Sequence, residues 1–177
     1  MSGGEKDIVP PGRPNLIILD EDFKRINACL LRLSQEARSK AVFLVDKNGQ
    51  LISSQGETAG LDTASLASLT AGNIAATGGL AQLLGEKEFS ILFHEGERDN
   101  LHISVISHRV ILAVIFDSRT SLGLVRLRVK KASEELARIY ADILKKADQD
   151  GGQAWAAFAA QFAQVTDEDI ENLFGRG

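Results

Sequence analysis

One long helix-forming pattern in this chain carries no charge. Residues 63–84 read TASLASLTAGNIAATGGLAQLL, without a single Asp, Glu, Lys or Arg. On one face of such a helix, apolar residues recur every three or four positions, with Asn73 in the remaining slot: Leu66, Leu69, Ala76, Leu80 and Leu83. The opposite face carries only small residues, namely Ala64, Ser68, Ala71, Ala75, Gly78 and Gly79.

The small-residue face predicts close contact with another helix or with a partner protein. Exposed helix faces normally carry Lys and Glu, and a glycine inside a helix costs roughly 1 kcal/mol relative to alanine. A helix buried on both sides is the other interpretation. A transmembrane helix is excluded, because Asn73, Gln82 and the Ser, Thr and Gly residues leave too little apolar transfer energy.

The rest of the pattern predicts two further helices and five strands. A helix extends from Asp20 to about Arg38. The strands AVFLVD and LISS follow, and Asn48-Gly49 between them predicts a type I′ hairpin turn. Three more strands are expected between Glu88 and Asp117, and the continuously apolar VILAVIF suits a central strand covered on both faces.

The last long helix is predicted from Thr120 or Ser121 to about Lys146. Its opening LVRLRV also alternates like a strand, but strong helix formers follow without a break. The element order α-β-β-α-β-β-β-α is that of an α+β domain with a five-stranded antiparallel sheet, over residues 18–147. Residues 1–17 are expected to be a disordered arm.

Residues 148–177 are expected to be a linker and a partner-binding tail. Asp148–Gln153 is the predicted linker, and Ala154–Val165 fits a short helix. The terminal TDEDIENLF has helical apolar spacing, typical of a short helix laid into a groove, at Ile170, Leu173 and Phe174. A merely solubilising acidic end is the alternative.

Composition narrows the class of protein. A net charge of −4 over 177 residues argues against nucleic acid as a partner. Cys29 is the only cysteine, so neither an intrachain disulfide nor a multi-cysteine zinc site can form. The polar opening does not resemble a signal peptide, and we expect a cytoplasmic protein that does not insert into membranes.

No pattern in the chain predicts catalysis, and we expect no catalytic residue, metal or cofactor. The phosphate-binding loop GxxxxGK[ST] is missing. A metal site of His94, His102 and His108 is conceivable, but histidines on a strand surface are commoner. Cys29 is expected to be a packed thiol. Arg119 has the alternatives of an arginine finger or a partner of Asp117.

A basic cluster inside this acidic chain has two interpretations. Arg126, Arg128, Lys130 and Lys131 form either a solvated helix face or a docking site for an acidic segment, for which the chain's own DEDIE is one candidate.

With these residues identified, the chain resembles the Roadblock family. The matching stretches are VFLVDKNGQLISS, DTASLASLTAGNIAATGGLAQLLGE, VIFDSRTSLGLVRLRVKKAS and DEDIENLF. Together with the connecting strands, they cover about residues 18–147 and the tail. Residues 1–17 and AWAAFAAQFAQ depart from the family pattern.

The resemblance implies a homodimer that pairs sheet edges and central helices. In members that regulate bacterial cell polarity and motility, it implies that the dimer binds a Ras-like small GTPase at a cell pole and accelerates GTP hydrolysis without a catalytic arginine. Ala75 and Gly79 match small positions of the family's binding helix, and the terminal peptide favours nucleotide exchange. A scaffold that recruits a GTPase or motor and a small-molecule sensor are the competing functions.

Overall fold

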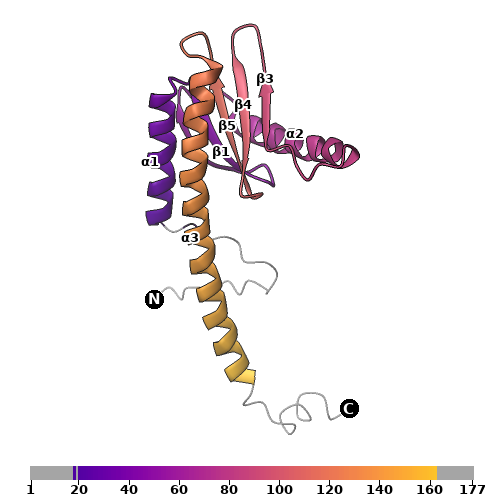
Figure 1. Ribbon diagram of the computed structural model, residues 1–177. Helices are drawn as coiled ribbons and strands as arrows, with labels where there is room; N and C mark the ends of the chain where they lie inside the picture. Colours follow the sequence, from indigo (N-terminus) through magenta and orange to yellow (C-terminus); the bar gives the residue numbers. More distant parts are fainter. Residues whose placement is uncertain (1–17, 19, 163–177) are drawn as a thin grey trace. The chain divides into compact units, whose positions relative to one another are not determined.

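The computed structural model describes residue 18 and residues 20–162, with the element order that the sequence predicts (Figure 1). The elements are α1 (Asp20–Glu36), β1 (Ala41–Asp46), β2 (Leu51–Gly56), α2 (Thr63–Leu83), β3 (Ile91–His94), β4 (Asn100–Ile106), β5 (Val110–Phe116) and α3 (Leu122–Phe162). Residues Leu19–Ala141 form one compact unit, which holds the whole sheet, and Asp142 begins a second one.

The five strands form one antiparallel sheet in the order β2-β1-β5-β4-β3. The predicted central strand VILAVIF is β5, and it is buried almost throughout. Its neighbour β1 is equally apolar, with Val42 opposite Val114 and Phe43 opposite Ala113. Strands that are covered on both faces need no polar alternation, which explains the continuous apolar runs.

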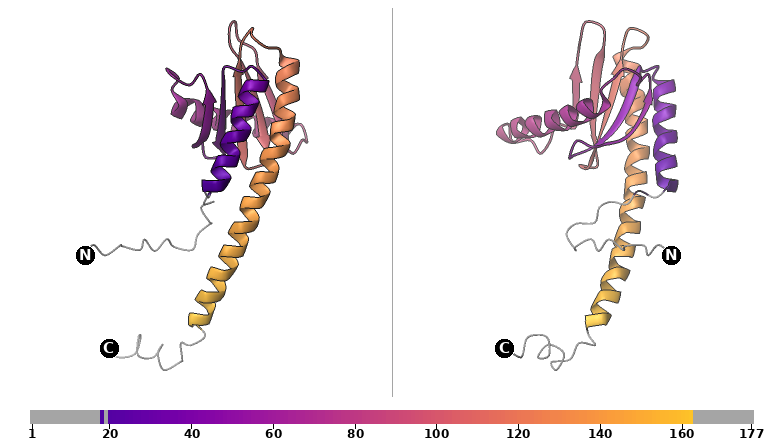
Figure 2. Two further views of the ribbon diagram at one scale, coloured as in Figure 1. Left: turned by 90° about the vertical axis from the view of Figure 1, so that its left-hand side faces the viewer. Right: turned by 180° about the vertical axis from the view of Figure 1, so that it is seen from behind.

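Helices cover both faces of this sheet. Figures 1 and 2 show α1 and the first half of α3 side by side on one face, and α2 on the other. Because successive side chains of a strand point to opposite faces, Phe43 and Val45 pack against α2. Val42 and Leu44 are fully buried on the opposite face. The domain therefore has three layers and two apolar cores.

The hairpin predicted at Asn48-Gly49 exists, but the predicted turn type is wrong. A type I′ turn needs positive φ at both central residues, and only Gly49 has it, at +88°. The Gly49 amide donates to the Asp46 carbonyl at 3.1 Å, and the Asp46 amide donates to the Gln50 carbonyl at 2.9 Å. This is a three-residue loop, a type I turn followed by a left-handed glycine.

A type I′ conformation instead occurs in the turn between β4 and β5. Ser107 and His108 have φ values of +50° and +55°. The Arg109 amide closes this turn on the Ile106 carbonyl at 3.0 Å. A two-residue hairpin between two twisted strands selects this turn even without glycine.

Helix α3 begins as predicted and continues beyond the predicted end. The Ser121 hydroxyl accepts from the Leu124 amide at 3.2 Å and caps the first turn. The sequence predicts an end near Lys146 and a linker at Asp148–Gln153, but the helix continues through Gly151-Gly152 to Phe162. Two glycines cost roughly 2 kcal/mol in a helix, and the alanine-rich stretch that follows them favours its continuation. The predicted arm 1–17 and the tail residues Ile170, Leu173 and Phe174 lie outside the described residues.

One buried histidine couples this fold to pH. His102 of β4 is 1% exposed, and neither ring nitrogen has a hydrogen-bond partner among the described residues. Its cross-strand neighbours, Phe93 and Val114, are apolar. Burial, and then the charge of Arg126, lower the pKa of His102 below the ordinary histidine value of 6.5. The folded protein therefore keeps this ring neutral.

We predict that His102 makes the fold less stable in acid. Below pH 6.5 the His102 ring binds a proton more readily in the unfolded chain than in the folded protein. The free energy of unfolding therefore falls as the pH drops. His102→Leu removes this proton linkage, while the other titrating groups stay the same. Urea unfolding at pH 7.5 and pH 5.5 should show a larger loss in the wild type than in the variant. An equal loss in both proteins would contradict the assignment.

Candidate protein-interaction surface

Helix α2 starts at a well-defined cap and contains no ionised side chain. The Asp62 carboxylate accepts from the Ser65 amide at 3.1 Å and from the Ser65 hydroxyl at 2.6 Å. These two bonds lower the pKa of Asp62 and satisfy a free donor of the first turn. The helix itself, Thr63–Leu83, has no Asp, Glu, Lys or Arg. Among the described helices, none is both long and apolar enough to cross a membrane.

The buried side of α2 is made mostly of small and medium residues, and of the leucines Leu66 packs partly against the core. Its buried residues are Ala67, Thr70, Ala71, Ile74 and Ala81. Of these, Ala67, Ala71 and Ile74 pack against large side chains of the sheet, including Phe43, Ile103 and Ile111. Because these strand residues already fill the space between the layers, alanines on the helix allow it to approach the sheet closely.

The leucine row of α2 is therefore on the outside. Leu69 is 71% exposed, Leu80 is 56% exposed and Leu83 is 84% exposed. The sequence pattern did not identify these leucines as interaction residues. Their spacing, with Asn73 and Ala76 between them, alternates between three and four residues. That alternation is typical of helices that pair with another helix. It is the sequence feature from which these leucines could have been identified as interaction residues.

Most of the predicted small-residue row is also accessible. Ala64, Ser68, Ala75 and Gly79 are exposed, and Gly78 is half-buried. Ala71 is 8% exposed and belongs to the core, so a partner cannot reach it in this conformation. The outer side of α2 thus carries two uncharged rows, the small residues on one flank and the leucines on the other.

The edge strand β3 extends this apolar surface. It lies at one end of the strand order and pairs with β4. Ile91 is 56% exposed. The Asn73 amide nitrogen lies 2.9 Å from Nε2 of His94, which joins α2 to this edge. A large neutral surface next to an open sheet edge is typical of a protein–protein interface.

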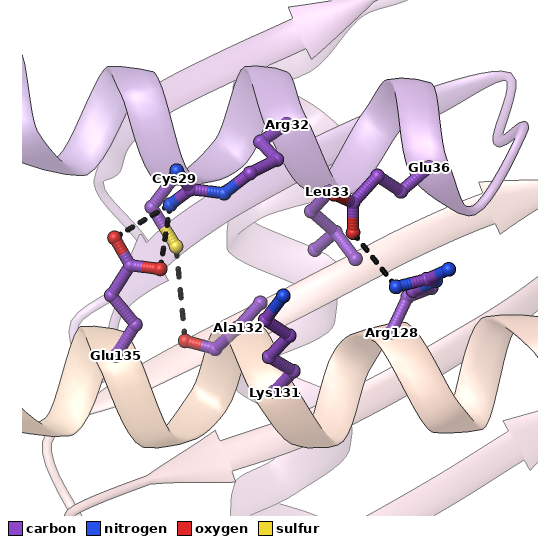
Figure 3. Close-up of a pocket in the computed structure, with 8 residues that line it drawn as sticks. All are labelled: Cys29, Arg32, Leu33, Glu36, Arg128, Lys131, Ala132 and Glu135. Carbon is purple, nitrogen blue, oxygen red and sulfur yellow. Dashed lines mark hydrogen bonds and ion pairs between the residues drawn. The ribbon is translucent and has the colours of Figure 1, made fainter.

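The predicted alternatives for a metal or reactive site are not supported. His94 and His102 lie on neighbouring strands but point to opposite faces of the sheet. No group of three metal-binding side chains occurs in the described part of the chain. Cys29 is buried, and burial raises the pKa of its thiol to about 11. Its sulfur contacts the Ala132 carbonyl between α1 and α3 (Figure 3). The cavity beside it measures about 10 Å³, at most the space of one water.

Arg119 forms ion pairs with two carboxylates of its own chain. Its Nη1 lies 2.6 Å from Glu57 and its Nε lies 2.9 Å from Asp117. Hydrogen bonds from Arg119 lower the pKa of both acids. The prediction that Arg119 neutralises Asp117 is confirmed.

The basic cluster is only partly paired. Arg128 lies 3.1 Å from Glu36 of α1 (Figure 3), whereas Arg126, Lys130 and Lys131 are exposed. Most of its cations are therefore exposed, which agrees equally with a solvated helix face and with a docking site for an acidic segment.

Comparisons with known proteins agree with the fold. A Roadblock/LC7 domain model matches residues 26–116. No curated protein sequence gives a significant match. A solved Roadblock/LC7 domain from Streptomyces avermitilis, 18% identical with a TM-score of 0.56 over 63% of this chain and 94% of its own, shares the fold.

Two solved bacterial proteins are much more similar in sequence. MglB of Myxococcus xanthus is 60% identical, with a TM-score of 0.69 over 72% of this chain and 96% of its own. The gliding protein MglB of Thermus thermophilus is 33% identical, with a TM-score of 0.68 over 74% of this chain and 99% of its own. The chain belongs to the Roadblock/LC7 family, and within that family it closely resembles MglB.

Proposed function

We propose that this protein is a homodimeric activator of an MglA-like small Ras-like GTPase, acting in the cytoplasm at a bacterial cell pole to control polarity and motility. The observation that supports this proposal best is the outer side of α2, where small residues and exposed leucines form one uncharged surface. The similarity to MglB supports the choice of a small GTPase as the proposed partner.

The proposed activation works by position and not by a donated catalytic group. Arg119 already pairs with Glu57 and Asp117, and moving it into another protein would break both contacts. A flat neutral helix can instead hold mobile loops of a GTPase in the orientation that hydrolysis requires. This leaves the chemistry to the GTPase and its nucleotide.

We predict that Ala75→Arg combined with Gly79→Arg abolishes GTPase binding. Both positions are exposed, and a Cβ at Gly79 would meet no atom within 4 Å, so the fold should tolerate the change. Two long cations on the small-residue row prevent close approach and bring unpaired charges into the contact. Binding is measured by titration calorimetry and folding by circular dichroism.

The matched control for this variant is Ala28→Arg combined with Gly123→Arg. These positions are also exposed and helical, but they lie on α1 and α3. The control should bind as the wild type does. Normal binding by a folded Ala75 and Gly79 double variant would remove α2 from the proposed interface.

The leucine row and the edge strand β3 are proposed as the dimer contact. Leu80→Asp with Leu83→Asp should therefore give a monomer near 19.1 kDa in analytical ultracentrifugation, because each buried charge costs several kcal/mol. Leu127 of α3 is also exposed, at 62%, so Leu127→Asp serves as the control and should stay dimeric.

A wild type that sediments as a monomer at micromolar concentration refutes the proposed dimer.

The terminal segment 166–177, outside the described residues, is proposed as a second contact that promotes nucleotide exchange. Its acidic start and the spacing of Ile170, Leu173 and Phe174 support this role. Removing residues 166–177 should slow exchange or weaken affinity, since a tethered second contact raises the effective concentration. Release of a fluorescent GDP analogue measures this, and an unchanged rate with unchanged affinity leaves the segment without a role at the GTPase.

A further inference from the structure

The turn between β1 and β2 is locked by bonds to a single residue. Oδ1 of Asp46 accepts from the amides of Asn48 and Gln50, each at 2.9 Å. The carbonyl of Asp46 accepts from Gly49, and its amide donates to Gln50. Four hydrogen bonds over five residues leave this turn one backbone conformation.

The tip of this turn lies against the backbone of α2. A Cβ on Gly49 would lie 3.1 Å from Cα of Ser68 and 3.6 Å from Cβ of Ala71. Ordinary contacts of a Cβ begin at about 3.4 Å. A backbone atom cannot rotate away as a side chain can, so only glycine allows the present spacing between turn and helix.

The turn also forms an ion pair with the connection between α2 and β3. Lys47 Nζ lies 3.9 Å from Glu88 in the α2–β3 connection, and Glu88 lies 2.5 Å from His108 in the β4–β5 turn. Because four hydrogen bonds to Asp46 hold the turn in shape, we expect α2 to shift when the spacing between the turn and the helix changes.

We propose that the β1–β2 turn is a positioning element, in which Gly49 sets how deeply the first half of α2 rests on the sheet. Through this depth it controls the binding surface of α2 without contacting the partner itself. The contact reaches Ser68 and Ala71, which belong to the same row as Ala75 and Gly79. The proposal rests on the function proposed above for that row.

The test compares Gly49→Asn with Gly60→Asn. Both glycines have a left-handed φ, +88° and +80°, and asparagine tolerates this region better than other side chains. At Gly60 a Cβ would meet nothing within 4 Å. The two variants therefore share the backbone strain, and only Gly49→Asn adds atoms against α2. Urea unfolding should show a global stability in Gly60→Asn close to that of the wild type.

Hydrogen exchange on the protein alone provides the direct readout. Amides of residues 63–74 should exchange faster in Gly49→Asn and at the wild-type rate in Gly60→Asn, because only the former displaces α2. This arm needs no partner, so it distinguishes failure of the positioning proposal from failure of the proposed function. Unchanged exchange in 63–74 of a folded Gly49→Asn variant overturns the proposal.

Binding to the GTPase provides the second readout. Gly49→Asn should weaken affinity by at least about tenfold, since small misplacements of a contact surface are costly. Gly60→Asn should bind as the wild type does. Asn48→Ala, which trims an exposed side chain of the same turn, should also bind normally. A comparable loss in Asn48→Ala would mean that the turn contacts the partner, and would contradict a purely positional role.

Discussion

The close approach of helix α2 to the sheet is the contact on which the rest of this structure depends. Ala67 and Ala71 pack against the strands, where Phe43 and Ile111 already fill the gap between helix and sheet. Leu66 packs partly against this core, whereas Leu69, Leu80 and Leu83 are exposed to solvent. One packing constraint thus creates both the stable inner side of α2 and the uncharged outer side that we assign to partners.

The element order was predictable because periodicity alone sets it. Alternation every two residues and recurrence every three or four distinguish strands from helices, and the continuous apolar run of β5 indicated its central place. The buried face of α2 was not predictable in this way. The helix is apolar or neutral all round, so its own pattern favours no side. The choice depends on the size of residues in β1, β4 and β5, which only the folded sheet brings together.

Two further differences have local physical causes. The Asn48-Gly49 pair signalled a hairpin correctly, but the Asp46 carboxylate stabilises a three-residue loop instead of a two-residue turn. The segment Asp148–Gln153, which contains Gly151 and Gly152, was expected to be a linker, yet α3 continues through it. Of the small-residue row, the exposed members could be found from the sequence, whereas the burial of Ala71 depends on its packing against the sheet.

These features agree with the proposal that the protein acts through its surface. Arg119 is held by its own carboxylates and Cys29 is buried with a raised pKa. Single-turnover GTP hydrolysis by an MglA-like GTPase, with and without saturating protein, tests the central claim most directly. The account predicts a rate increase of at least about tenfold, equal to a barrier lower by ~1.4 kcal/mol. Tight binding with an unchanged rate would contradict it and leave a scaffold that recruits the GTPase without activating it.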